Sequence, residues 1–129
     1  MIERLRRFAA LPSRWPKALR WTVVGLSLVV VFWLALSPAE DAPSIGFSDK
    51  IQHGLAFAAL TGAYGLMFPH RRRGVLAGVA AVGVAIEVLQ GVMPFGRDAE
   101  AADLAADAIG MLVGFLVLRR LAGRPRPPT

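Results

Sequence analysis

Four long, mostly apolar runs constrain the fold of this chain more than any other feature. They cover residues 19–36, 51–68, 75–93 and 104–121. Each run is close to the length of about 20 residues that an α-helix needs to cross a bilayer. With 55% hydrophobic residues in only 129, the chain carries more apolar surface than a soluble domain of this size can bury. We therefore expect an all-α membrane protein whose four transmembrane helices form an antiparallel bundle.

Prolines mark the ends of these runs. Pro16 precedes the first run, and Pro38, Pro69 and Pro94 follow the first three. Proline cannot continue a helix, so each one supports a helix boundary nearby. The chain is then expected to have three parts: a basic interfacial segment, a four-helix transmembrane domain and a disordered tail, at residues 1–18, 19–121 and 122–129.

The basic residues lie almost entirely on one side of this topology. Thirteen of the fifteen Lys and Arg residues are in the amino-terminal segment, between the second and third runs, or at the carboxyl end; only Lys50 and Arg97 lie on the other side. By the positive-inside rule, both termini are cytoplasmic and the protein is a multi-pass protein of the inner membrane. The net charge of +6 is then expected to meet anionic lipid headgroups rather than nucleic acid. A cleaved signal peptide over residues 1–39 is a rival interpretation, but its apolar run exceeds the usual length.

Polar side chains gather at the outer ends of the second, third and fourth runs. Helical spacing places them on one stripe of each helix, and the inner ends of these stripes are small or aromatic. Ionisable groups at membrane depth are costly and usually pair inside a bundle, so we expect the stripes to converge around a cavity open to the outside. Arg97 is expected to lie over this cavity. The stripes are Asp49, His53, Phe57, Leu60 and Tyr64; Gly83, Glu87, Gln90 and Pro94; and Asp103, Asp107, Gly110 and Gly114.

Each of these positions receives an expected role. The functional or catalytic candidates are Glu87, His53 and Asp103; the ligand-binding candidates are Asp49, Lys50, Gln90, Arg97 and Asp107; the packing candidates are Gly110 and Gly114. Lys50 and Arg97 are expected to pair with anions, and Gln90 to orient the ligand. Four carboxylates oppose these two cations, so a proton, a charged His53 or a bound cation is expected to offset the difference. Glu87 is the candidate to hold such a proton.

The polar positions resemble those of the VanZ family of small membrane proteins. The matching motifs are Asp49-Lys50-x-x-His53-x-x-x-Phe57, Glu87-x-x-Gln90-x-x-x-Pro94-x-x-Arg97 and Asp103-x-x-x-Asp107-x-x-Gly110-x-x-x-Gly114, within about residues 48–118. The family usually has Asn where this chain has Asp107, which adds a titratable group. The resemblance implies a four-helix membrane protein. For the best-known member of the family, it implies lowered sensitivity to teicoplanin-type antibiotics.

The expected function is action at the outer face on a cell-envelope lipid, a wall precursor or an amphiphilic drug. Two alternatives stay open: a small proton-coupled transporter built around Glu87, and a carboxylate-dependent enzyme acting on a lipid-linked substrate. The second to fourth runs contain neither Ser nor Cys, which disfavours a Ser–His or Cys–His nucleophile. The oligomeric state is left undetermined.

Purely structural roles for the same residues stay open as well. Ser48 and Asp49 are suited to capping a helix, and Glu87 could form a purely structural pair with Arg97 or Lys50. No cofactor and no metal is expected. A metal site is the weaker alternative: it would combine His53 with Glu87, Asp103 and Asp107, and its oxygen-rich ligands would favour Mg, Mn or Ca.

Overall fold

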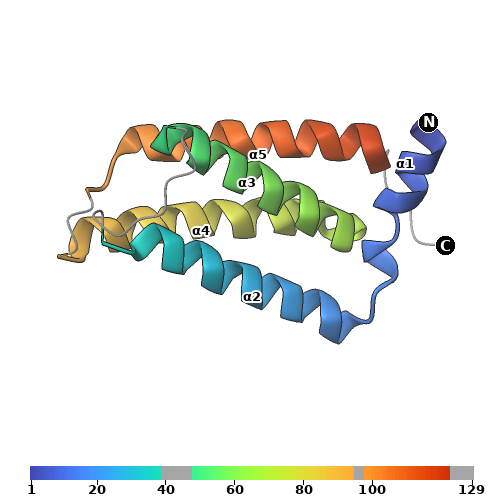
Figure 1. Cartoon of the computed structure of the whole chain (residues 1–129), viewed down its shortest axis with the longest axis horizontal. Helices are drawn as coiled ribbons and strands as arrows, with labels where there is room; N and C mark the ends of the chain where they lie inside the picture. The colour runs from blue at the N-terminus through green and yellow to red at the C-terminus, as the bar shows by residue number, and fades with distance from the viewer. Residues whose placement is uncertain (39–47, 95–97, 123–129) are drawn as a thin grey trace.

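The computed structural model describes residues 1–38, 48–94 and 98–122, and this part of the chain is helical without any strand (Figure 1). Arg97, Ala39 and the tail from residue 123 onward lie outside the described residues. The elements are α1 (Ile2–Ala9), η1 (Pro12–Arg14), α2 (Lys17–Leu36), α3 (Asp49–Met67), η2 (Pro69–Arg71), α4 (Arg72–Val92) and α5 (Ala101–Ala122).

Prolines and one polar cap account for most of the helix ends. Helix α2 begins directly after Pro16 and ends at Leu36, directly before its C-cap residue Ser37. Ser48 caps α3, because its Oγ accepts a hydrogen bond of 3.3 Å from the backbone N–H of Ile51. Pro69 opens the short turn η2 between α3 and α4. Each predicted apolar run begins two or three residues after the first residue of the corresponding helix and ends within one residue of its last.

The four long helices lie alongside one another, and each runs opposite to the helix before it (Figure 1). Helices α3 and α5 share the most extensive contact. Glycines permit their close approach: a Cβ atom at Gly110 would overlap the carbonyl oxygen of Gly54, and one at Gly114 would overlap that of Ala58. Small residues promote helix association in lipid because they let backbones meet.

The buried core is small, and most of the outer surface is apolar. The core consists of side chains from α3 and α4, namely Phe57, Leu60, Tyr64, Met67, Val79 and Ile86. Helix α2 buries none of its residues completely, and its Trp33 and Val29 are each 66% exposed. So much exposed apolar surface is typical of a protein whose solvent is lipid rather than water.

Three segments of the described chain are long and apolar enough to cross a membrane: Lys17–Leu36, Pro69–Val92 and Ala101–Ala122. Helix α3 is 19 residues long, but its first turns contain Asp49, Lys50 and His53, which lower its mean hydropathy. The second predicted span, residues 51–68, therefore stays a prediction.

Polar contacts connect α2 to its neighbours. The hydroxyl groups of Ser27 and Tyr64 are 2.6 Å apart and join α2 to α3. At the other side of the fold, a guanidinium nitrogen of Arg20 donates a hydrogen bond of 2.9 Å to the carbonyl oxygen of Met67. A cation at this place satisfies a free carbonyl at the carboxyl end of α3 and complements the helix dipole.

Candidate functional site: a polar cluster between three helices

The polar cluster lies where the amino ends of α3 and α5 meet the carboxyl end of α4. Four of its side chains are 3–5% exposed although each is polar or charged: Glu87, Gln90, Asp103 and Asp107. His53 is partly buried beside them, at 12% side-chain exposure. These polar side chains are buried because they share a helix face with interior residues. Phe57 of α3 and Gly114 of α5 are examples of such interior residues. The described stripe residues of α4 and α5 are all buried except Pro94.

Lys50 joins α3 to the start of α5 through two carboxylates. Its Nζ donates hydrogen bonds to Asp103 and to Glu100. Lys50 stands ahead of the apolar part of α3, and its hydrogen bonds to Asp103 and Glu100 raise its pKa well above the usual value. It therefore stays a cation, but one already neutralised by carboxylates. The expectation that Lys50 pairs with an anionic ligand stays a prediction.

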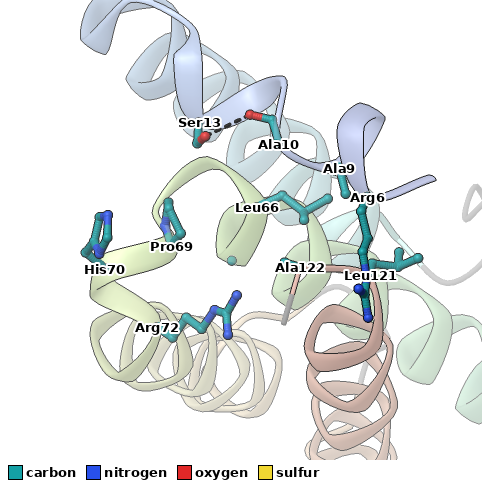
Figure 2. A pocket seen from close by; sticks show the side chains of 11 residues that line it. Arg6, Ala9, Ala10, Ser13, Leu66, Pro69, His70, Arg72, Leu121 and Ala122 are labelled. Carbon is teal, nitrogen blue, oxygen red and sulfur yellow. Dashed lines mark hydrogen bonds between the residues drawn. The ribbon is translucent and has the colours of Figure 1, made fainter. Parts of the chain in front are cut away.

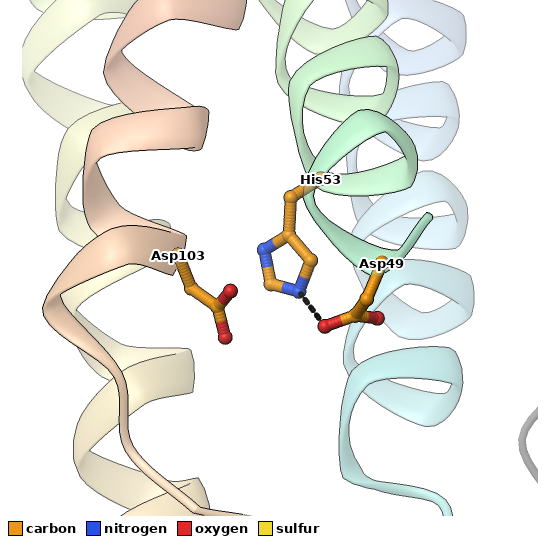
Figure 3. Close-up of side chains that lie close together, drawn as sticks. All are labelled: Asp49, His53 and Asp103. Carbon is orange, nitrogen blue, oxygen red and sulfur yellow. Dashed lines mark ion pairs between the residues drawn. The ribbon is translucent and has the colours of Figure 1, made fainter. Parts of the chain in front are cut away.

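His53 lies between carboxylates of its own helix and of α5. Its Nδ1 is 2.9 Å from Oδ1 of Asp107, and its Nε2 is 3.8 Å from Oδ2 of Asp49. Figure 3 shows the ring between Asp49 on one side and Asp103 on the other. Both ring nitrogens thus face carboxylate oxygens, which orients the imidazole across the gap between α3 and α5.

Glu87 and Gln90 hold the α4 side of the cluster. Oε2 of Glu87 accepts a hydrogen bond of 2.9 Å from the backbone N–H of Glu100, and Nε2 of Gln90 donates one of 2.8 Å to the carbonyl oxygen of Ala35 in α2. Within the described residues Glu87 does not pair with Lys50, whose partners are those given above. The alternative pair of Glu87 with Arg97 lies outside the described residues.

Three buried oxygen atoms of the cluster have no hydrogen-bond partner among the described residues. They are Oε1 of Glu87, Oε1 of Gln90 and Oδ2 of Asp107. All three are acceptors. Because an unsatisfied buried polar atom is costly, this arrangement favours a species that brings donors or positive charge.

Glu100 is the residue that sequence reasoning missed. Its side chain binds Lys50, its N–H binds Glu87, and its carbonyl oxygen accepts the N–H of Asp103 at 3.0 Å. It therefore connects the ends of α3, α4 and α5. Its position in the sequence could have indicated this role, because Glu100 lies three residues before Asp103. A separation of about one helical turn brings the two acidic side chains to the same end of α5.

The described cluster is strongly acidic. It contains five carboxylates, and against them stand Lys50 and, when protonated, His53. With all five carboxylates ionised and His53 protonated, three negative charges remain. The carboxylates are Asp49, Glu87, Glu100, Asp103 and Asp107.

Asp49, His53 and Asp103 are the residues that could hold a metal ion. One ligand atom from each lies within 4.8 Å of the others. The set differs from the one suggested by the sequence, since Glu87 and Asp107 are not in it. Two carboxylates and one imidazole suit Mg, Mn or Ca better than a soft metal. Lys50 competes for this place because it already binds Asp103.

Comparisons with family models, with curated proteins and with solved structures gave no match to this chain. The VanZ resemblance therefore rests on its three sequence motifs alone.

Proposed function

We propose that the chain is a four-span, multi-pass protein of the inner membrane with both termini in the cytoplasm. The distribution of charge supports this topology. Helix α1, the turn between α3 and α4 and the carboxyl end of α5 lie at one end of the molecule (Figure 1), and their Arg residues suit the cytoplasmic side. In this proposal α3 is also a membrane span, which brings the number of spans to four. Helix α5 shields the polar first turns of α3.

The polar cluster is then at the outer face, and it binds the donor-bearing or cationic group of a cell-envelope lipid, a wall precursor or an amphiphilic drug. The observation that carries this proposal is the set of three buried acceptors without partners among the described residues, on Glu87, Gln90 and Asp107. The excess of carboxylates points the same way, because a bound ammonium group offsets their negative charge and, as an amide group also would, supplies the missing donors.

Each residue has a role in this binding. Glu87 is the central acceptor, and Gln90 orients the ligand beside α2. His53 and Asp107 form the opposite wall. Lys50 with Asp103 closes the outer end and holds α3 against α5.

The motif resemblance extends the proposal to a biological setting. VanZ-like spacing at the cluster favours a part in the response of the cell envelope to teicoplanin-type drugs. The acidic cluster would act by binding such an amphiphile or a lipid-linked wall precursor.

Expression in a susceptible host tests this function. Wild type, Glu87→Gln and the control Asp98→Asn are compared for sensitivity to a lipoglycopeptide and for envelope lipid composition. Asp98 is an exposed carboxylate at the same end of the molecule. We expect Glu87→Gln to abolish the effect of the wild-type protein and Asp98→Asn to retain it. Equal behaviour of wild type and Glu87→Gln removes Glu87 from the proposed site.

The chain has no cysteine, which allows a clean test of the topology. Single cysteines at Ser13 and at Asp98 are labelled in intact cells with a membrane-impermeant maleimide. The proposal expects labelling at Asp98 and protection at Ser13 until the cells are opened. The reverse pattern contradicts the orientation, and labelling of both sites contradicts the four-span topology.

A further inference from the structure

A cavity of about 370 Å³ lies at the end of the molecule opposite the polar cluster. It is half open, and it is bordered by α1 and η1 on one side and by the ends of α3, α4 and α5 on the other (Figure 2). Its volume is within the range of small-molecule sites. The residues that line it are Arg6, Ala9, Ala10, Ser13, Gly65, Leu66, Pro69, His70, Arg72, Leu121 and Ala122.

The polar part of this lining is basic. Arg6 extends from α1 and Arg72 from α4, and both side chains reach into the space beneath Leu66 (Figure 2). Arg119 of α5 is close enough for its charge to repel that of Arg72. Among the described residues no carboxylate lines the cavity, and of the described Asp and Glu residues only Glu3 belongs to this end of the molecule. An anion between these guanidinium groups would offset their repulsion.

The remaining lining is apolar, and the surroundings are those of a membrane surface. Leu66, Leu121 and Ala9 form much of the wall. Helix α1 exposes Ile2 and Phe8, at 63% and 67%, next to its arginines. A helix of this kind lies in the interface between lipid headgroups and acyl chains. A free phosphate ion would use only the basic part of the lining, whereas a lipid would use both parts.

We propose that this cavity binds the phosphate headgroup of one anionic membrane lipid. Arg6 and Arg72 hold the phosphate, and the glycerol and the first acyl carbons lie against the apolar wall. The site is independent of the polar cluster and of its ligand. A bound lipid would tie α1 to α4 and α5, so it would also set the position of the amino-terminal segment.

Native mass spectrometry of the purified full chain tests the proposal, with short-chain phosphatidylglycerol as the probe. We expect one saturable site in the wild type. Near a membrane surface each arginine contributes roughly a fivefold gain in affinity for anionic lipid, so Arg6→Gln with Arg72→Gln should weaken binding about 30-fold. The matched control is Arg7→Gln with Arg73→Gln, which removes the same charge from exposed positions on α1 and α4. It should change binding less than threefold.

Further arms distinguish the lipid site from misfolding, from general surface attraction and from a free-phosphate site. Replacement of both Arg6 and Arg72 by Lys keeps the charge and should keep most of the affinity, so that a loss in the Gln pair cannot be assigned to misfolding. Short-chain phosphatidylcholine should bind at least tenfold more weakly than phosphatidylglycerol. Equal losses in the two Gln pairs would overturn the proposal in favour of general surface attraction. Displacement of the lipid by an equal concentration of inorganic phosphate would overturn it in favour of a free-phosphate site.

Discussion

The contact between α3 and α5 makes a sharp prediction for Gly110. A Cβ atom there would lie 2.8 Å from the carbonyl carbon of Gly54 and 2.9 Å from its Cα, and it would overlap the carbonyl oxygen. These neighbours are backbone atoms within a helix, so no rotamer change can relieve the contact. Gly110→Ala must therefore push the two helices apart.

The cost follows from the distances. Ordinary van der Waals contact begins near 3.4 Å, so the carbonyl carbon alone requires the helices to separate by about 0.6 Å, and the closer carbonyl oxygen requires more. A gap of that size forfeits about a quarter of the dispersion energy of the atoms that face it. In lipid this packing is a main source of helix association. We expect Gly110→Ala to lower the free energy of unfolding by about 1–3 kcal/mol, as overpacking does in other cores.

Unfolding in mixed micelles by added dodecyl sulfate, followed by circular dichroism, measures this change. The matched control is Gly62→Ala in α3, because nothing lies within 4 Å of a Cβ atom at that position. The control should change the free energy of unfolding by less than about 0.5 kcal/mol. If Gly110→Ala proved as stable as Gly62→Ala, the close approach of α3 and α5 would be refuted.

Three further predictions concern single polar contacts. Tyr64→Phe removes the hydrogen bond to Ser27 and should lower the free energy of unfolding by about 1 kcal/mol in the same assay; a loss of equal size in a Ser27→Ala background would contradict the contact. Ser48→Ala removes the cap of α3 and should cost about 1 kcal/mol, while Ser48→Asp should restore stability; failure of Asp to do so would argue against capping. For Mn²⁺ binding, measured by electron paramagnetic resonance, the dissociation constant should be no lower than about 1 mM in the wild type. It should be lower in Lys50→Met, because the Nζ of Lys50 no longer competes with the metal ion for Asp103. Weaker binding in the variant would count against that competition.

Much of the helical framework could be predicted from the sequence. Proline positions and apolar length locate the helices to within a few residues, because both act within a single helix. The inward faces could also be predicted, since a spacing of three or four residues places side chains on one stripe whatever the neighbours are. The buried positions of Glu87 and Asp103 follow from that rule.

The pairing inside the cluster could not be predicted in the same way. It depends on the register of α3 against α5, which their glycines set through contacts between distant parts of the chain. Lys50 therefore meets Asp103 and Glu100 rather than an open space for an anion. The partner of Gln90 is a backbone carbonyl, a group that every residue has and no motif reveals. The basic cavity could not be predicted either, because it needs α1 to turn back onto the end of α5.

The loose attachment of α2 has a consequence for how a ligand reaches the cluster. This helix covers the α4 side of the site through an amide-to-carbonyl contact between Gln90 and Ala35, and it buries none of its own residues completely. In the proposed orientation, a modest outward tilt of α2 would open a lateral path between the cluster and the outer leaflet. The proposed amphiphilic ligand would then enter with its headgroup first while its tail remained among the lipids.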